Sequence, residues 1–470
     1  MSQNRMMRLL DGLWLLALAV YVFAGMPLAS FHGDEAMQIY MSHDYATAFI
    51  YKEPQRLMVQ PPYYIDEDNW LRILNGSVNR YAIGLSWHLA GFTTGDLPPR
   101  PGWDWGLSVE RNVETGHRPP QALLNASRFS STLFLALSAG LMFAIGGQFG
   151  GRLPAYFMSA LHTLNPVILL NGRRAMMEGS LLFFGLLTIF AAILISKMIT
   201  QNRDGFETRP YSRRREILLW ALLALAGGLT LTSKHSGVVF VAGAWGWILA
   251  AAVIKTLPLS LREKVPEGEG SIISLPVTVL KLAAAGVLAV ALFVALSPAL
   301  WNDVPSRLRD LVEQREGLLQ IQVEADPRAP TTLGQRFEGL LVQPFMTPAM
   351  HYESLVWDGS PTAAAEIADY MASPLSGLQF GVLLGLPLTL LAGFGLAALV
   401  LPRLRPAGGW ILGLPAWMLV TAASLLVNPL PWQRYYLPWL PVVTVLAGAG
   451  LLAARRVLST LARPGGVGET

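Results

Sequence analysis

The sequence predicts an all-α polytopic membrane protein with about ten transmembrane helices and two long external segments. First, 53% of its 470 residues are hydrophobic and only 14% are charged. Second, the apolar residues fall in runs close to the ~20 residues that cross the hydrocarbon core of a bilayer. Third, Lys and Arg gather in alternate short loops, as the positive-inside rule requires of a chain that crosses a membrane repeatedly.

The expected spans follow one another along the chain with two long interruptions. They cover residues 9–29, 123–147, 152–170, 179–199, 217–233, 237–254, 276–298, 376–401, 409–427 and 437–454. The first run is longer than the core of a signal peptide, and no convincing cleavage site follows it. We therefore expect it to be retained as a span.

The basic residues predict the orientation of these spans. With a cytoplasmic N-terminus, most basic residues of the short loops lie inside, in 5–8, 197–215, 255–264, 403–405 and 455–456. Those left in short outside loops are Arg173, Arg174, Lys234 and Arg434. An even number of spans returns the C-terminus to the cytoplasm. The sequence thus predicts an integral plasma (inner) membrane protein with both termini cytoplasmic.

Two segments outside the membrane are long, 30–122 and 299–375, and each contains an apolar stripe at helical spacing. The stripes are Leu71, Leu74, Val78, Ala82, Leu85 and Leu89 in the first, and Leu308, Leu311, Val312, Leu318 and Leu319 in the second. Such stripes among charged residues are typical of amphipathic helices at a membrane surface. We expect a single transmembrane domain, 1–470, that carries both segments as exoplasmic loops.

Composition also excludes several classes of function. The chain has no cysteine, which removes disulfides, thiolate zinc sites and thiol nucleophiles together. No run of Lys and Arg interleaved with aromatic residues indicates a nucleic-acid partner. No His-x-x-x-His or Glu-x-x-His spacing indicates a metal site. Carboxylates beside a phosphate still leave open an oxygen-bound Mg²⁺ or Mn²⁺.

The candidate site begins with Asp34 and Glu35, two adjacent carboxylates directly after the first expected span. Other ionisable or polar residues stand at outer span ends: Arg128, Arg173, Arg174, Glu178, Lys234, His235, Arg434 and Tyr435. A carboxylate can remove a proton from a nucleophile, and Arg and Lys can hold phosphate oxygens. This combination fits group transfer from a lipid-linked phosphate donor, whose leaving phosphate gains charge that fixed cations stabilise.

Each of these residues also has a purely structural interpretation. Asp34 could be the N-cap of a helix that starts at Glu35, since Asp is favoured there. Arg173 and Arg174 could anchor lipid headgroups, and Lys234 could extend from a span end toward the interface. His235 could be a hydrogen-bonded interface residue.

Several short motifs, in order along the chain, resemble those of one family. They are Gly33-Asp34-Glu35-Ala36, Ala126-Ser127-Arg128-Phe129, Phe149-Gly150-Gly151-Arg152, Arg173-Arg174-Ala175-Met176-Met177-Glu178, Thr232-Ser233-Lys234-His235 and Arg434-Tyr435-Tyr436-Leu437-Pro438. The chain resembles the GT-C superfamily of membrane glycosyltransferases, specifically the dolichyl-phosphate-mannose:protein mannosyltransferase-like group (glycosyltransferase family 39) and its bacterial relatives.

The resemblance implies the GT-C fold and inverting transfer of a sugar from a polyprenyl-phosphate donor at the exoplasmic face. It implies Asp34 as catalytic base and Glu35 as a positioning or acceptor-binding partner. It places Glu178 and either Arg173 or Arg174 on the donor side, with Lys234 and Arg434 facing phosphate. The 299–375 segment is too short for the β-trefoil of fungal protein mannosyltransferases, and no soluble domain follows the last expected span. The acceptor, whether protein, lipid or glycan, therefore stays open.

Two other classes compete with this interpretation. A transporter or flippase for a lipid-linked substrate would place charges at mid-span and show inverted repeats. A non-catalytic partner in envelope assembly would use the outer helices to bind another protein.

Overall fold

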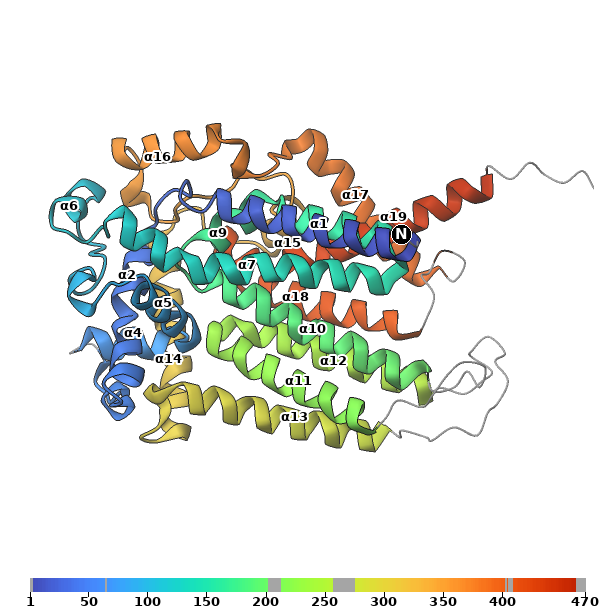
Figure 1. Cartoon of the computed structure of the whole chain (residues 1–470), viewed down its shortest axis with the longest axis horizontal. Helices are drawn as coiled ribbons and strands as arrows, with labels where there is room; N and C mark the ends of the chain where they lie inside the picture. Colours follow the sequence, from blue (N-terminus) through green and yellow to red (C-terminus); the bar gives the residue numbers. More distant parts are fainter. Residues whose placement is uncertain are drawn as a thin grey trace, which may run out of the picture.

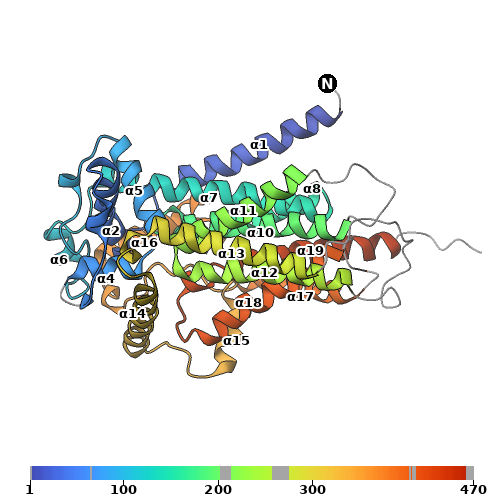
Figure 2. The same cartoon turned by 90° about the horizontal axis from the view of Figure 1, so that it is seen from below.

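Long apolar helices lie side by side and form a bundle (Figure 1), from which α1 (Gln3–Ala24) tilts away toward its N-terminal end (Figure 2). The computed structural model describes residues 3–63, 66–201, 213–256, 275–401, 404 and 409–461. Within these ranges the regular elements are all helical. Three of the expected inside loops, with their basic residues between 202 and 212, 257 and 274, and 402 and 408, lie largely outside the described residues.

Among the described residues, eight helices are long and apolar enough to cross a membrane. They are α1 (Gln3–Ala24), α7 (Gln121–Gly150), α10 (Glu178–Gln201), α11 (Arg213–Ser233), α12 (Val238–Thr256), α13 (Leu275–Leu296), α17 (Gly381–Val400) and α19 (Trp439–Leu461). Each corresponds to one expected span. The all-α polytopic class is therefore confirmed.

The other two expected spans differ from a straight transmembrane helix. Residues 152–170 form α8 (Arg152–Thr163) and α9 (Pro166–Arg173), which meet at an angle of 61°. The break has a local cause, because Pro166 disfavours a helical residue before it. The side chain of Asn165 then caps α9 by accepting the N–H groups of Val167 and Ile168.

The expected span 409–427 becomes the 3₁₀ turn η10 (Gly409–Gly413) and the short helix α18 (Leu414–Val427). Its 14 residues are fewer than the ~20 that a straight span needs. Within the described residues the structure thus supports eight spans, or nine if the bent pair counts as one, and the expected number of ten is not confirmed.

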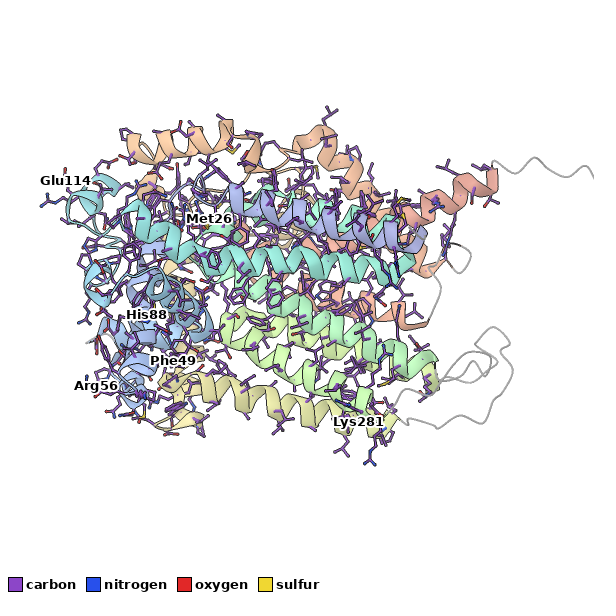
Figure 3. The ribbon with its side chains drawn as sticks, in the orientation of Figure 1. Met26, Phe49, Arg56, His88, Glu114 and Lys281 are labelled. Carbon is purple, nitrogen blue, oxygen red and sulfur yellow. The ribbon has the colours of Figure 1, made fainter. Side chains whose placement is uncertain are left out.

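Both long external segments contribute helices to one end of the bundle (Figure 1). These helices are α2 (Gly33–Met41), α3 (His43–Tyr45), α4 (Glu67–Leu74), α5 (Ser77–Leu89), α6 (Val109–Glu114), α14 (Val304–Ala325) and α16 (Pro361–Ala372). A further helix, α15 (Leu333–Val342), contacts α18. Arg56 and Glu114 mark this end in Figure 3, whereas Lys281 marks the opposite end. The first residues of α1 and the last of α19 lie at that opposite end (Figure 1).

The first amphipathic stretch is two helices, α4 and α5, rather than the single helix expected over 71–89. The chain breaks at Gly76, where a Cβ would overlap the backbone carbonyl of Ser233. The polar face of α5 turns inward, so that Asn79 and Arg80 are buried, while Leu89 is 76% exposed. The expected polarity is therefore reversed along α5, because its polar residues serve interactions at the external end of the bundle.

Small residues allow the spans to approach closely. A Cβ on Gly395 of α17 would overlap the backbone of Leu446 in α19, and one on Gly450 would overlap that of Leu391. Close backbone approach through small residues is how helices associate within lipid, where burial of apolar surface between them supplies little driving force. α10 packs against α7 and α11, α19 packs against α7, and α5 of the first external segment contacts both α7 and α11.

Candidate active site

A cavity of about 470 Å³ lies where the span ends meet the two external segments. Its polar and aromatic lining residues are Asp34, Gln38, Trp70, Asn75, Trp105, Glu178, Lys234, Arg315, Gln322, Asp326, Glu353, Ser354, Trp432, Arg434 and Tyr435. Apolar side chains from α4 and α14, among them Leu74 and Leu318, complete the wall. The cavity therefore combines a polar floor with apolar sides, as expected of a site for an amphipathic ligand.

Asp34 stands at the first turn of α2, whose N-cap is His32. Its carboxylate lines the cavity, with a side chain 16% exposed, and accepts a hydrogen bond from the Arg434 guanidinium of η11 (Gln433–Tyr436). Burial acts to raise the pKa of Asp34, but the charge and the hydrogen bond of Arg434 hold it below its ordinary value. Asp34 is thus an ionised carboxylate that faces the cavity at neutral pH.

Glu35, although adjacent in sequence, faces the protein interior. It is fully buried and forms a two-armed ion pair with Arg128 of α7, with both N–O distances 2.7 Å. Its Oε1 also accepts the backbone N–H of Ala175 at 2.9 Å. Burial acts to raise the pKa of Glu35, and the Arg128 charge with these hydrogen bonds lowers it. Neither Glu35 nor Arg128 lines the cavity.

Arg173 and Arg174 also turn away from the cavity. The Arg173 guanidinium donates to Tyr21 O (2.7 Å), Val22 O (2.9 Å) and the Tyr370 hydroxyl (3.0 Å), and so binds the carbonyl end of α1. Carbonyls at a helix C-terminus carry the negative end of its dipole, which favours a cation there.

Arg174 donates to Ser30 O at 3.0 Å and His351 O at 2.8 Å. Burial lowers the pKa of Arg174. Both arginines thus join segments distant in sequence. As donor-binding residues they stay predictions.

Glu178 and Lys234 do face the cavity, and they do so as a pair. Lys234 Nζ lies 2.6 Å from Glu178 Oε1 and 5.7 Å from the centre of the Tyr435 ring. His235 points elsewhere, into a separate small cavity lined by Arg72, Arg80 and Ser297 among others. The structure therefore brings together five of the predicted site residues at one cavity: Asp34, Glu178, Lys234, Arg434 and Tyr435.

Several cavity residues were not predicted as site residues from the sequence. Arg315 of α14 lines the cavity and forms no hydrogen bond or ion pair with another residue of the described chain. Glu353 lies against Arg434 and His32 from the second external segment. In the sequence, Arg315 was one charge in an amphipathic stretch and Glu353 stood in no motif. Only the tertiary fold brings them to Asp34.

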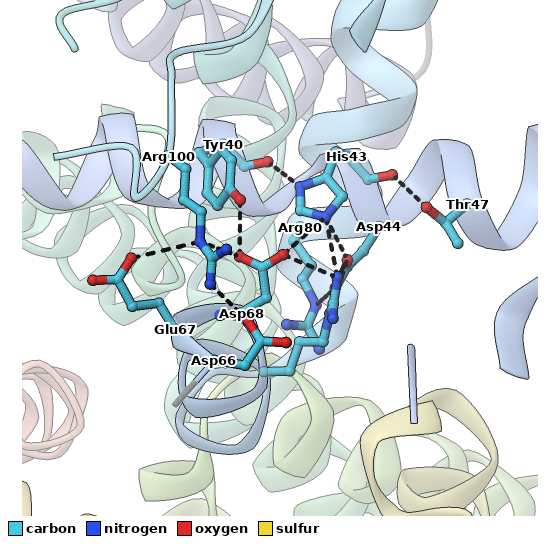
Figure 4. A network of polar contacts seen from close by, with 10 residues as sticks. Tyr40, His43, Asp44, Thr47, Asp66, Glu67, Asp68, Arg80 and Arg100 are labelled. Atoms are coloured by element: carbon cyan, nitrogen blue, oxygen red, sulfur yellow. Dashed lines mark hydrogen bonds and ion pairs between the residues drawn. The ribbon is translucent and has the colours of Figure 1, made fainter. Parts of the chain in front are cut away.

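A charge network in the first external segment supports the α2 side of the cavity (Figure 4). Its centre is Asp44, which is fully buried and pairs with Arg72 (2.9 Å) and Arg80 (3.3 Å). Tyr40 of α2 donates to Asp68 of α4 at 2.8 Å. These contacts fix α4, and with it the cavity residues Trp70 and Asn75, against α2. Within the described residues, no three potential metal ligands come together.

Comparison with known proteins identifies the architecture. Residues 117–298 match the family model of dolichyl-phosphate-mannose-protein mannosyltransferases. The crystal structure of ArnT from Cupriavidus metallidurans bound to undecaprenyl phosphate matches 96% of this chain and 62% of its own, at 12% identity and a TM-score of 0.50. The chain has the GT-C fold.

Two other GT-C structures are similar to the chain. The S. cerevisiae protein O-mannosyltransferase Pmt1-Pmt2 complex bound to the sugar donor matches 63% of this chain and 34% of its own, at 14% identity and a TM-score of 0.42. The Archaeoglobus fulgidus oligosaccharyltransferase AglB, in complex with an inhibitory peptide and a dolichol-phosphate, matches 97% and 52%, at 11% identity and a TM-score of 0.46. The chain thus spans about a third to about three fifths of the length of these proteins. No curated protein sequence matches it significantly.

Proposed function

We propose that this protein is a membrane glycosyltransferase that moves a sugar from a polyprenyl-phosphate-linked donor to an acceptor at the exoplasmic face. One observation carries the proposal: the ionised Asp34 carboxylate shares a cavity at the external end of the bundle with three cations, Arg434, Lys234 and Arg315. The match of residues 117–298 to the protein mannosyltransferase model supports the reaction class. The undecaprenyl phosphate bound to ArnT supports the class of donor.

The donor phosphate would lie among the cavity cations. Arg315 forms no ion pair with another described residue, so a phosphate there would satisfy it without breaking an existing pair. Lys234 and Arg434 already pair with carboxylates and would share their charge with the phosphate. The apolar side chains of α14, including Leu318 and Ile321, line the same cavity and would accept the first part of the polyprenyl chain.

In the reaction, an acceptor O–H or N–H group attacks the anomeric carbon while the bond from that carbon to the phosphate oxygen breaks. The proton passes to Asp34, and the polyprenyl phosphate leaves with an added negative charge that the cations stabilise. A single direct displacement inverts the configuration at the anomeric carbon. A phosphate that draws Arg434 away from Asp34 would also raise the basicity of the carboxylate when the donor is bound.

The proposal implies an orientation of the molecule in the membrane. The cavity lies at the end of the bundle that carries the long external segments, opposite the first residues of α1 and the last residues of α19 (Figure 1). An exoplasmic cavity thus goes with cytoplasmic termini, as the basic loops predict. The membrane lipids and the donor are the expected partners. The acceptor is a protein, a lipid or a glycan.

The cavity charges also bear on the competing functions. Asp34, Arg434 and Glu353 belong to helix starts and external segments rather than to mid-span positions, which favours surface chemistry over transport through the bundle.

The test is Asp34→Asn in the full-length protein, assayed for transfer of labelled sugar from undecaprenyl-phosphate-linked hexoses and pentoses to an envelope extract. We expect transfer to be lost while donor binding and melting temperature stay close to those of wild type. Glu67→Gln, which removes a 57% exposed carboxylate of the same segment, is the matched control and should keep full activity. Full transfer by Asp34→Asn would refute the base assignment.

A further inference from the structure

We propose that Glu353 is a positioning residue that fixes the Asp34 carboxylate by holding His32 in one tautomer. The inference rests on the proposed function of Asp34. It concerns a residue more than 300 positions away in sequence, which reaches the site only through the fold.

The hydrogen bonds of His32 define its tautomer. The Asp34 backbone N–H donates to His32 Nδ1 at 3.1 Å, so Nδ1 is an acceptor and carries no proton. In a neutral imidazole the proton then resides on Nε2. Glu353 Oε2 lies 2.7 Å from His32 Nε2 and accepts that proton in a hydrogen bond. Glu353 therefore favours the one tautomer that lets His32 cap the helix bearing Asp34.

The surroundings leave His32 little freedom to adopt another arrangement. Its side chain is 2% exposed, and its ring stacks on Trp357 with centroids 5.7 Å apart. The Glu35 carboxylate closes the capping box by accepting the His32 backbone N–H at 3.2 Å. A loss of the Nε2 partner would leave a buried donor unsatisfied, which favours transfer of the proton to Nδ1 and loss of the cap.

Glu353 is itself held in place. Its backbone carbonyl accepts a hydrogen bond from Arg328 at 2.6 Å, and Arg328 pairs with Asp326 at 2.9 Å. Asp326 in turn accepts the indole N–H of Trp432 at 2.7 Å. These contacts connect the second external segment to η11, so that Glu353 has a fixed position relative to both His32 and Arg434.

Glu353 also shares Arg434 with Asp34. Arg434 Nε lies 3.4 Å from Glu353 Oε1, while its Nη1 donates to Asp34 Oδ2. The negative charge of Glu353 raises the pKa of Asp34, in opposition to Arg434. Glu178, Lys234, Arg315 and Asp326 are the other charges that line the same cavity. Through Arg434, Glu353 thus influences the basicity of Asp34 as well as its position.

Two substitutions separate positioning from charge. Glu353→Gln keeps an oxygen that can accept the Nε2 proton, whereas Glu353→Ala removes the acceptor. Asp369→Asn, an exposed carboxylate on α16, is the matched control. The full-length protein would be assayed with undecaprenyl-phosphate-linked sugars and envelope extract. The tautomer of His32 would be read from ¹⁵N-histidine spectra, with the His32 signal assigned through His32→Gln.

We expect Glu353→Ala to change the His32 tautomer signal and to lower kcat about 10²-fold, the scale of loss that a small misplacement of a reacting group produces. Its KM for the donor should stay near that of wild type. Glu353→Gln should keep the His32 signal and most of kcat. The acid limb of the pH–rate profile of Glu353→Gln should move to lower pH, because loss of the Glu353 charge lowers the pKa of Asp34.

The possible failures are distinguishable. Glu353→Ala with an unchanged His32 signal and wild-type kcat would overturn this inference, even with Asp34→Asn inactive. A Glu353→Gln variant as impaired as Glu353→Ala, without a shift of the acid limb, would overturn it as well. Full transfer by Asp34→Asn would refute the proposed function instead, and the His32 spectra would still decide the contact.

Discussion

The buried pair of Glu35 and Arg128 makes a quantitative prediction about stability. Both side chains are at most 1% exposed, and the carboxylate receives four hydrogen bonds, two of them from Arg128. The substitution Arg128→Met removes the counter-charge and fills much of the volume. It leaves Glu35 as a buried carboxylate without its direct ion-pair partner, with two backbone N–H donors and the more distant charge of Arg174.

The cost follows from the loss of that ion-pair partner. Removal of one partner of a buried ion pair typically destabilises by about 3–5 kcal/mol. With an unfolding entropy of about 2.1 cal/mol/K per residue, a chain of 470 residues loses about 1 °C of melting temperature per kcal/mol. We therefore expect Arg128→Met to melt about 3–5 °C below wild type at neutral pH.

The effect also has a pH signature. In wild type, the lowered pKa of Glu35 means that its stabilising contribution is present above the ordinary value of 4.5 and is lost as pH falls through the folded pKa. In Arg128→Met, burial is opposed only by the Arg174 charge and the backbone donors, so we expect the folded pKa of Glu35 to rise instead. The charged Glu35 then destabilises the folded variant above that raised pKa. This destabilisation shrinks as pH falls toward the pKa of Glu35 in the unfolded chain. The gap to wild type should narrow on acidification.

The assay is thermal unfolding of purified protein in detergent, followed by tryptophan fluorescence at several pH values. The double variant Glu35→Gln/Arg128→Met is the control, since an uncharged Gln can still accept both backbone N–H groups. It should recover most of the lost melting temperature. A single variant that melts with wild type, or a double variant no better than the single one, would refute the assignment of a buried structural ion pair.

Three further predictions concern the cavity. Arg315→Ala should raise the KM for the polyprenyl-phosphate donor by about tenfold or more, as expected for a lost charge-assisted contact of ~1.5–3 kcal/mol. The control Arg309→Ala, which removes an exposed arginine of the same helix, should leave the donor KM unchanged. Equal donor KM values for the two variants would contradict a phosphate role for Arg315. Gly76→Ala should lower melting temperature and transfer together, because its methyl group meets the Ser233 carbonyl next to Lys234, whereas Gly91→Ser, at a left-handed turn with open space around it, should affect only stability. The lowered pKa of Asp34 in the free protein predicts that this base stays ionised until pH falls below 3.8, so a pH profile of kcat/KM with an acid limb near neutrality that Asp34→Glu displaces would contradict it.

Sequence patterns were sufficient for much of the fold because lipid restricts the chain so strongly. A run of ~20 apolar residues has few stable alternatives to a spanning helix, and eight such runs became single long helices. The bend between α8 and α9 was also encoded locally, in Asn165-Pro166, although the span was expected to be straight. The orientation of α5 could not be read in this way. Its inward polar face depends on Asp44 of α3, which pairs with Arg80 of α5.

The candidate site also contains some residues that the sequence predicts and others that it does not. Asp34, Glu178, Lys234, Arg434 and Tyr435 could be anticipated, since ionisable residues at span ends are costly unless they are used. Arg315 and Glu353 could not, because a charge in an exposed amphipathic stretch has no distinguishing local pattern. The contacts that each predicted site residue makes could not be predicted from the sequence either. Arg173 and Arg174 look like phosphate ligands in sequence, yet their guanidinium groups bind backbone carbonyls.

The different environments of Asp34 and Glu35 follow from helix geometry. Consecutive residues in a helix point about 100° apart, which lets the two side chains of this adjacent pair face different surroundings. Here Glu35 turns inward to Arg128 and completes the capping box, while Asp34 turns to the cavity and Arg434. The inner carboxylate thereby fixes the helix that carries the outer one. An Asp34→Glu/Glu35→Asp exchange, which keeps the charge but shortens the inner arm and lengthens the outer one, should therefore cost both stability and transfer. A fully active and stable exchange variant would show that neither arm length matters and would contradict this division of roles.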